Sequence, residues 1–372
     1  MKTIKYLLAI CLFLVSCDTE KKVIDLYDID VDTSLDTEDI FSSVSFVPLE
    51  TTEDCLLRTP NVFAADDENV FIWDRNNIYR FALDGKFRNR IGTFGKGHGE
   101  HGSLNSANYD KKHWIVLLGT RDGFIYKYDI NGNYLGRFRL TSKKEMLQAA
   151  RWNSDLDCMV CEVRKYTADG LTVYLKTVSA DGEELKSYTV YSDKEKIGVS
   201  MYKTGMLRNG IGGAYFKLPF DNRLFLLSSE GLSVELTLDQ GKNTPSRRYI
   251  EDMEYREMNS DSQHHIDKMV ITDKYIFLSI IQKRACQEVI VSRETNTVVY
   301  NSVYSYGPER HIRIPGMAET TFWPWVSDGN TCMDLLHVEE MGEQDLQRLG
   351  IDIAAAEQMG MGLNPILVIA KQ

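Results

Sequence analysis

Residues 69–91, NVFIWDRNNIYRFALDGKFRNRI, contain the pattern that decides the fold. Three short runs rich in aromatic and β-branched residues are separated by two polar turns, at residues 75–77 and at Asp84-Gly85. An Asp-Gly pair between such runs is a strong signal for a β-hairpin. The stretch therefore predicts three antiparallel strands, at residues 69–74, 78–83 and 86–91.

The same unit recurs along the chain. The hairpin glycines Gly85, Gly132 and Gly182 lie 47 and 50 residues apart, and related units follow at residues 223–250 and 275–303. Each unit has a short upstream stretch that can supply an inner strand. These inner strands are expected at residues 61–64, 107–111, 148–152, 213–218 and 267–271. Four short antiparallel strands in a repeat of about 50 residues are the signature of a propeller blade.

A sixth unit uses both ends of the chain. It begins at residues 320–326, continues at 331–338 and ends at 365–370, but it lacks an outer strand. The run at residues 44–49 has no unit of its own, and as the outer strand of the last blade it would close the ring and cover an exposed edge. We therefore expect an all-β fold, a six-bladed β-propeller at residues 41–372. Its blades should be four-stranded and antiparallel, with a short helical insertion in the last one.

The composition narrows the possible functions. The chain has 54 acidic and 43 basic residues, so its formal net charge is 43 − 54 = −11. This balance argues against a nucleic-acid partner, which requires a basic surface. With 43% hydrophobic and 10% aromatic residues, the chain can bury a sizeable core, and extended disorder is excluded for most of it.

The N-terminus has the features of an export signal. Lys2 and Lys5 precede an apolar run at residues 6–15, half of the ~20 residues that span a bilayer. The run ends in Leu14-Val15-Ser16-Cys17, which resembles a lipobox; the alternative is a plain secretory signal. We expect a signal peptide at residues 1–16 and a lipidated Cys17 with a tether to residue 40. The expected location is the cell envelope, anchored by lipid to the outer membrane.

The remaining cysteines do not form a disulfide framework. Besides Cys11 in the signal and Cys17, five cysteines are scattered along the chain, an odd number. Cys158 and Cys161 have CxxC spacing but lie in a predicted strand, where residues three apart point to opposite faces. We interpret them as buried thiols rather than as a redox or zinc pair.

Three stretches carry a family resemblance. Residues 47–52 (VPLETT), residues 91–100 (IGTFGKGHGE) and residues 364–367 (NPIL) resemble the six-bladed β-propeller lipoproteins of glycan-using Gram-negative bacteria, which have NHL-like repeats. His98 stands where that family usually has proline. The resemblance implies the fold and an envelope location. It implies no reaction and supplies no catalytic residues.

Candidate ligand-binding residues are those expected at one mouth of the central channel. In a propeller, the connections between blades and the loops joining the second and third strands emerge on one face, where ligands usually bind. The residues assigned to this face are Arg75, His98, Glu100, His101, Arg121, His264, His265, Arg284, Arg310, His311, Trp323 and Trp325. The residues expected to gather at its mouth are His98, Glu100, Arg121, His264, Arg310 and His311.

Two subsets of these residues suggest a ligand chemistry. Arg75, Arg121 and Arg284 occupy equivalent turns and could hold an anion such as an acidic sugar; the alternative is solvated turn residues. Trp323 and Trp325 share one face of a strand and could stack on a sugar ring. The alternative for the tryptophans is packing between blades.

No catalytic motif stands out. The spacing of His98 and His101 is three, in a glycine-rich loop, whereas a zincin has two histidines four apart on a helix. We expect no metal and no cofactor. The leading hypothesis is a non-catalytic binding or scaffolding protein for a glycan or an envelope partner protein. The alternatives are a hydrolase or lyase with its site at the channel mouth, and a purely structural assembly subunit.

The lipobox-like sequence gives a first testable prediction. Replacing the acceptor thiol, Cys17→Ala, should release the protein from membranes or leave it as uncleaved precursor, as cell fractionation and mass spectrometry of the N-terminus would show. Cys11→Ala is the matched control, because it removes a thiol of the signal that is not expected to be lipidated. Normal membrane retention of a Cys17→Ala protein with a mature, unlipidated N-terminus would contradict the prediction.

Overall fold

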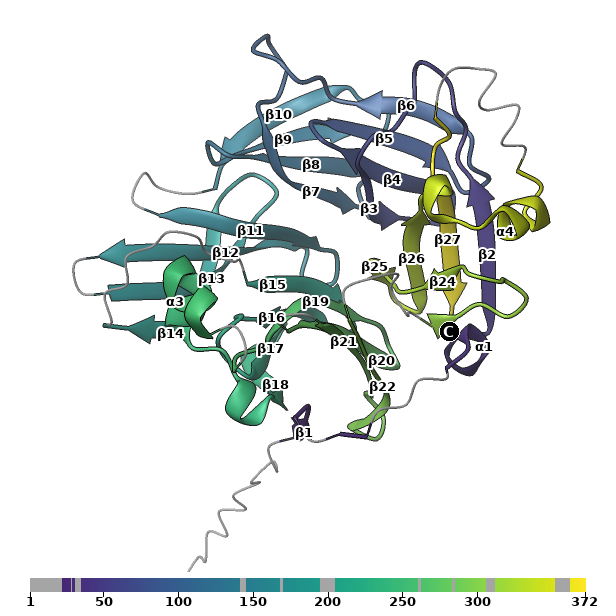
Figure 1. Cartoon of the computed structure of the whole chain (residues 1–372). Helices are drawn as coiled ribbons and strands as arrows, with labels where there is room; N and C mark the ends of the chain where they lie inside the picture. Colours follow the sequence, from purple (N-terminus) through teal and green to yellow (C-terminus); the bar gives the residue numbers. More distant parts are fainter. Residues whose placement is uncertain are drawn as a thin grey trace, which may run out of the picture.

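The computed structural model describes residues 22–27, 29–30, 35–140, 145–167, 170–194, 205–259, 262–282, 285–305, 312–351 and 362–372. Six antiparallel sheets are arranged like blades around a common axis (Figure 1). This arrangement confirms the six-bladed β-propeller. The hairpin glycines Gly85, Gly132 and Gly182 have φ angles of +87°, +89° and +90°, so the same left-handed turn recurs in three blades.

Blades 1, 2, 3 and 5 each contain four consecutive antiparallel strands, as the repeat predicts. Blade 1 consists of β3 (Pro60–Ala65), β4 (Asn69–Asp74), β5 (Asn77–Ala82) and β6 (Phe87–Ile91). Blade 2 consists of β7 (Leu104–Asp110), β8 (Ile115–Thr120), β9 (Phe124–Asp129) and β10 (Tyr134–Arg139). Blade 3 consists of β11 (Met146–Asn153), β12 (Cys158–Thr167), β13 (Gly170–Val178) and β14 (Glu184–Asp193). Blade 5 consists of β19 (His265–Ile271), β20 (Tyr275–Ile281), β21 (Ala285–Ser292) and β22 (Thr297–Ser305).

Blade 4 corrects the sequence-based register by one strand. It consists of β15 (Met206–Gly210), β16 (Gly213–Lys217), β17 (Arg223–Ser228) and β18 (Gly231–Asp239). Residues 213–218, expected to form the inner strand, therefore contain the second strand. Residues 247–250, expected to form the outer strand, lie in helix α2 (Arg247–Glu251). The Ser246 side chain accepts a hydrogen bond from the Tyr249 amide and so caps this helix.

Blade 6 is closed by the N-terminal strand, as predicted. It consists of β25 (Val326–Asp328), β26 (Thr331–Leu336), β27 (Ile366–Lys371) and β2 (Ser43–Pro48). Strand β2 pairs with β27 in antiparallel register. The inner strand is shorter than expected, because β24 (Thr321–Phe322) pairs with β23 (Ile312–Arg313) outside the blade.

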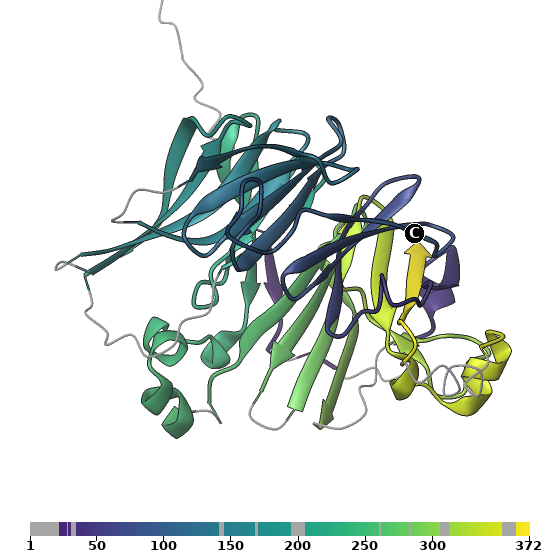
Figure 2. The ribbon, with the colours of Figure 1, turned by 90° about the horizontal axis from the view of Figure 1, so that it is seen from above.

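The helices lie outside the blade sheets. The insertion in blade 6 contains η2 (Val338–Glu340) and α4 (Glu343–Arg348), which confirms a short helical insertion. The helix formers at residues 352–359 lie outside the described residues. Between blades 4 and 5 lie η1 (Gly241–Asn243), α2 and α3 (Met253–Asn259). The green helices α2 and α3 and the yellow α4 project from the same side of the propeller (Figure 2), which we call the helical face.

A segment of the expected tether packs on the propeller. Strand β1 (Val23–Asp25) pairs in parallel with β18 and adds a fifth strand to blade 4 (Figure 1). Ile24 and Leu26 are buried in the core between blades 4 and 5. Farther along, Asn301 of blade 5 donates to the carbonyl of Asp30, and α1 (Thr37–Ile40) packs against blade 6. The described residues of this segment, 22–27, 29–30 and 35–48, therefore lie at the outer edges of three blades.

The hydrophobic core is divided among the seams between blades. Each of six clusters of buried side chains combines residues of two adjacent blades. In the seam between blades 1 and 2, for example, the rings of Phe71 and Tyr109 lie 4.3 Å apart. The inner strands contact one another in the order β3, β7, β11, β15, β19 and β25, and β25 contacts β3 again. Each blade is thus stabilised by both of its neighbours.

The pairing of β2 with β27 gives the second prediction. A chain that begins at residue 50 lacks β2 and exposes the edge of β27, so it should aggregate, as size-exclusion chromatography would show. A chain that begins at residue 22 keeps both β1 and β2 and should remain soluble and folded. A monomeric, cooperatively unfolding protein without β2 would show that the closure does not stabilise the ring.

Candidate functional site

The sequence-predicted site residues lie in the connections that form the helical face. Arg75 and Arg121 follow the second strands of blades 1 and 2, and the other described residues lie in connections between blades. Arg284, Arg310 and His311 lie outside the described residues. The remaining residues fall into separate groups at different seams, described in turn below.

The histidine loop after blade 1 is built around Glu100. The Glu100 carboxylate accepts a hydrogen bond from the Gly97 amide at 2.7 Å, and a Cβ at Gly95 would lie 1.9 Å from the same oxygen. His101 is fully buried against the edges of the Tyr126 and Tyr128 rings, and burial lowers its pKa. These contacts give Glu100 and His101 structural roles in the seam between blades 1 and 2.

His98 of the same loop packs edge-on against Tyr134 of the outer strand β10, with ring centroids 5.4 Å apart. His264 and His265 lie at the start of blade 5, after helices α2 and α3. Burial lowers the pKa of His264, and the His265 ring packs against Tyr249 of α2. The three histidines therefore belong to two seams, one in blades 1 and 2 and one beside α2.

The two tryptophans have different environments. Trp323 is buried and packs edge-on against Phe277 of blade 5, with ring centroids 5.5 Å apart, so it belongs to the core between blades. Trp325 is 40% exposed, and the Lys268 ammonium lies 4.3 Å from its ring centroid. Of this pair, only Trp325 offers aromatic surface to a ligand.

Four inner strands contain a β-bulge that the sequence reading missed. The pairing register shifts within β3, β7, β11 and β19, and the extra residues are Phe63, Asn105, Gln148 and Asp267. A bulge re-aims a side chain and is common beside functional sites. Asn105 and Asp267 are exposed, whereas the residues before them, Leu104 and Ile266, are buried.

The opposite face, which we call the hairpin face, carries a cavity at the channel mouth. This face is formed by the hairpins that join the first and second strands of each blade and, in blades 1 to 5, the third and fourth strands. The cavity has a volume of about 260 Å³ and is lined by first hairpins from five of the six blades. The lining residues are Lys111, Asn153, Ser154, Asp155, Asn209, Gly210, Ile211, Asp273, Ser327, Asp328 and Gly329.

Polar contacts tie the hairpins of this mouth together. The Lys111 ammonium of blade 2 lies 3.0 Å from the Asp328 carboxylate of blade 6, two blades that are not neighbours. The Asn153 amide donates to Asn209 at 3.1 Å, and the Ser327 hydroxyl donates to a backbone carbonyl of blade 5 at 2.6 Å. The mouth is therefore a pre-formed polar surface.

A second cavity of about 340 Å³ lies between blades 4 and 5 on the same face. It shares Ile211 and Asp273 with the first. In it, the Arg293 guanidinium donates to the Tyr215 hydroxyl at 2.5 Å and lies 4.0 Å from Glu235. One carboxylate oxygen of Asp273, Oδ1, is shielded from solvent and has no hydrogen-bond partner. Such a group is unusual in a folded protein and is suited to a ligand donor.

Sequence reasoning placed no site residue on the hairpin face. Ile211 lies in a turn rich in asparagine and glycine, and Asp273 lies in a three-residue turn between β19 and β20. Those residue types form turns whether or not they bind a ligand, so the turn composition alone could not identify the cavity.

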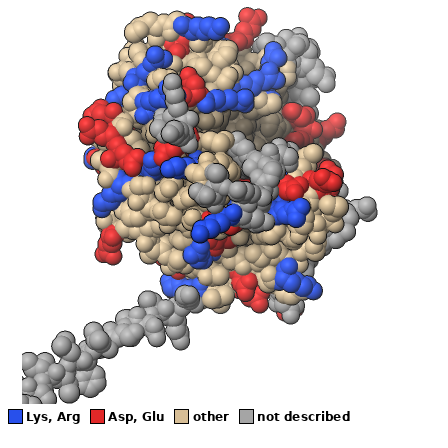
Figure 3. Space-filling view, turned by 90° about the vertical axis from the view of Figure 1, so that its left-hand side faces the viewer, with Lys and Arg blue, Asp and Glu red and all other residues tan. Residues whose placement is uncertain are grey.

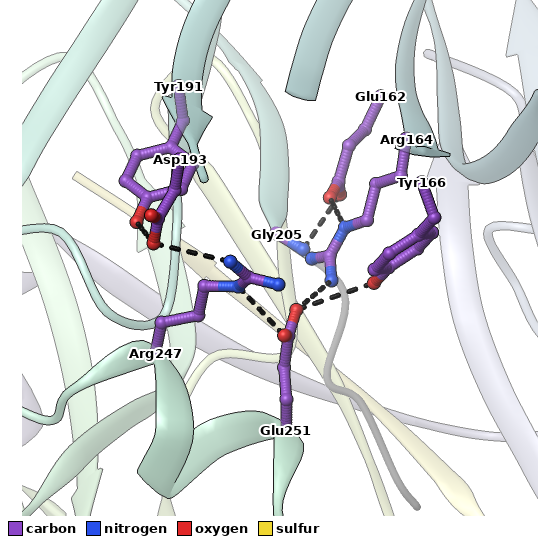
Figure 4. A network of polar contacts seen from close by, with 8 residues as sticks. All are labelled: Glu162, Arg164, Tyr166, Tyr191, Asp193, Gly205, Arg247 and Glu251. Atoms are coloured by element: carbon purple, nitrogen blue, oxygen red, sulfur yellow. Dashed lines mark hydrogen bonds and ion pairs between the residues drawn. The ribbon is translucent and has the colours of Figure 1, made fainter. Parts of the chain in front are cut away.

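A buried charge network joins blade 3 to α2 on the helical face (Figure 4). Arg164 lies 2.8 Å from Glu162 and 3.8 Å from Glu251, and Arg247 lies 2.8 Å from Glu251 and 3.2 Å from Asp193. The side chains of Glu162, Arg164 and Glu251 have no exposed surface. Burial raises the pKa of Glu162, and Arg164 opposes that shift. Because these side chains are closed to solvent, we assign the network a structural role.

We also searched the described part of the chain for metal sites, reactive cysteines and membrane-spanning helices. No group of three or more histidine, cysteine, aspartate or glutamate side chains there is arranged to hold a metal ion. Cys158 and Cys161 are free and buried, and they pack into different seams, as the strand geometry predicts. Burial raises the pKa of Cys158 to about 11. The helices of the described residues include none that is both long and apolar enough to cross a bilayer.

The surface shown in Figure 3 is mixed in charge. On this side of the molecule, lysine and arginine side chains are interspersed with aspartate and glutamate side chains. It therefore presents no broad surface of a single charge sign.

Comparisons with known proteins agree with this architecture. Residues 21–371 match the model of a family described as "Domain of unknown function (DUF4934)", and the chain belongs to this family. A Bacteroides fragilis protein named "Putative exported protein" has a similar structure, with 17% sequence identity and a TM-score of 0.65. The match covers 94% of this chain and 99% of that one. A Bacteroides caccae protein of unknown function is more distant, with 11% identity, coverage of 74% and 81%, and a TM-score of 0.36. No curated protein matches the chain.

The buried network gives the third prediction. Arg164→Met leaves Glu162 buried without a counter-charge and Glu251 with Arg247 alone, so the free energy of unfolding should fall by about 3–5 kcal/mol in urea titrations. The matched control is Arg88→Met on the exposed outer strand β6, which should change stability by less than about 0.5 kcal/mol. Equal effects of the two substitutions would show that the network does not stabilise the seam.

Proposed function

We propose that this member of the DUF4934 family is a non-catalytic binding protein of the cell envelope, which holds a glycan or an envelope partner protein at the hairpin face. The observation that carries the proposal is the cavity of about 260 Å³ formed by hairpins of five blades. A ligand in this position contacts most of the ring at once. Ligand pockets are concave and combine apolar surface with a few placed polar groups.

The rim and floor of this mouth supply both kinds of contact. Ile211 is 52% exposed, and Trp114, on the same hairpin as Lys111, is 55% exposed. Trp114 has a φ of +59°, which is unusual for a bulky residue. The unpaired Asp273 oxygen and the side-chain amide of Asn153 add hydrogen-bonding groups. Apolar and polar groups of this kind suit a sugar.

The proposed location is the outer membrane, with Cys17 as the lipid attachment site. Its support is the export signal together with a structural relative named as exported. The pairing of β1 with β18 says which part of the propeller would lie near the membrane. The Lys22 carbonyl accepts a hydrogen bond from the Thr237 amide of β18, so the chain five residues after Cys17 is fixed to blade 4. Five residues of extended chain span at most about 18 Å, so lipidation at Cys17 would hold the outer edge of blade 4 close to the bilayer.

The fourth prediction tests the hairpin face with Asp273→Ala. The mature protein should capture a glycan on an array or an envelope protein in a pull-down, and the substitution should weaken capture at least about tenfold. Because Asp273 Oδ1 has no hydrogen-bond partner, the melting temperature should not fall.

The matched control is Asp181→Ala, which removes an exposed carboxylate from a turn between third and fourth strands. It should bind like the native protein. If no glycan or envelope protein is captured, or if the two substitutions have equal effects, the proposed function is wrong.

A further inference from the structure

Three cationic side chains occupy consecutive inner strands of the propeller. They are Arg151 of β11, Arg208 of β15 and Lys268 of β19, and each of these strands contacts the next. Arg151 Nη1 donates to the Ala107 carbonyl of β7 at 3.3 Å, and Arg208 Nε donates to the Met269 carbonyl of β19 at 2.8 Å. Both guanidinium groups therefore reach along the channel wall to the inner strand of a neighbouring blade.

No carboxylate of the described residues lies within ion-pair distance, 4.0 Å, of Arg151, Arg208 or Lys268. Burial lowers the pKa of Arg151, and burial together with the positive charge of Arg151 lowers the pKa of Arg208 to about 10. Both side chains stay charged at neutral pH. Arg151 and Arg208 thus place two positive charges close together on half-buried side chains, without a counter-ion from the described residues.

The two buried arginines of the network beside α2, in contrast, are paired with carboxylates. Arg164 and Arg247 each lie close to two carboxylates in the network beside α2. Buried charges are normally paired, because an uncompensated charge in a low-dielectric environment costs several kcal/mol. Within the part of the chain that the structure describes, the channel arginines depart from this rule, which indicates that a ligand supplies their counter-charge.

Both guanidinium groups keep hydrogen-bond donors for a ligand. A guanidinium has five N–H donors. Arg151 uses Nη1 on the Ala107 carbonyl, and Arg208 uses Nε and Nη1 on the carbonyls of Met269 and Leu207. The Nη2 groups of both arginines make no hydrogen bond within the described residues. Planar N–H groups of this kind match the oxygens of carboxylates, sulfates and phosphates.

We propose that Arg151, Arg208 and Lys268 form an oxyanion-binding site in the central channel, which receives a carboxylate, sulfate or phosphate group of the ligand. This inference rests on the proposed binding function and names the chemistry of its ligand.

The experiment measures thermal unfolding of the mature chain at pH 7.5. The probes are sodium glucuronate, sulfate and phosphate, with glucose and sodium chloride at matched ionic strength as references. At least one oxyanion should raise the melting temperature in a saturable manner beyond the effect of chloride, because a ligand that binds only the folded state stabilises it. Glucose should not. The strongest probe among the three distinguishes an acidic sugar from a sulfate or phosphate ester.

The variants locate the effect. Arg208→Met removes the charge but keeps an apolar side chain of similar length, and it should abolish the oxyanion-dependent shift. Lys268→Met serves as a second variant, because Lys268 makes no hydrogen bond within the described residues and its loss should not impair folding; it should weaken the shift. Arg88→Met, outside the channel, should respond like the native protein.

Two results overturn the oxyanion site. One is the absence of any shift beyond that of chloride in the native protein; the other is an undiminished shift in both Arg208→Met and Lys268→Met. Failure of the proposed function has a different signature. If the captured partner is neutral and insensitive to Arg208→Met, the binding function stands and the oxyanion site is wrong. If the anions bind but no glycan or protein is captured, the oxyanion site stands and the proposed binding function is wrong.

Discussion

Backbone pairing between β2 and β27 holds the ring closed, and the other features of the propeller depend on it. The two strands lie more than 300 residues apart in the sequence, yet Val44 pairs with Ala370 and Phe46 with Val368. Closure fixes blade 6 against blade 1 and completes the sixth seam of the core. It also places Asp328 within reach of Lys111, so the ion pair between blades 2 and 6 at the hairpin mouth exists only in the closed ring.

Much of this architecture could be read from the sequence because it depends on local chemistry. The recurring Asp-Gly and Asn-Gly turns predicted the blades, and the unpartnered run at residues 44–49 predicted the closure. Blade 4 was misread because its first strand, β15, was not counted, so that every later strand moved by one position and residues 247–250 were assigned to the missing outer strand. The helical state of these residues depends on the Ser246 cap and on Arg247 and Glu251, which a strand pattern does not reveal.

The candidate sites were harder to predict. Turn residues such as Arg75 and Glu100 attracted attention because charged residues in loops are visible in a sequence. The structure shows that Glu100 accepts a hydrogen bond from the Gly97 amide and so stabilises its own loop. The channel residues Arg151 and Arg208 lie in the middle of inner strands, where the sequence gives no sign that neighbouring blades leave them without carboxylates. A bulge such as that at Asp267 is also invisible, because it breaks the alternation from which strand faces are inferred.

The route of residues 22–48 also has a mechanical consequence. A pull on the N-terminus, as from a membrane that moves relative to a bound partner, acts first on β1, whose hydrogen bonds to β18 lie side by side along the strand. Loading in this direction requires several hydrogen bonds to break together rather than one after another. Blade 4 therefore carries the tension before it can reach β2, and the strand that closes the ring is shielded from a force applied at the N-terminus.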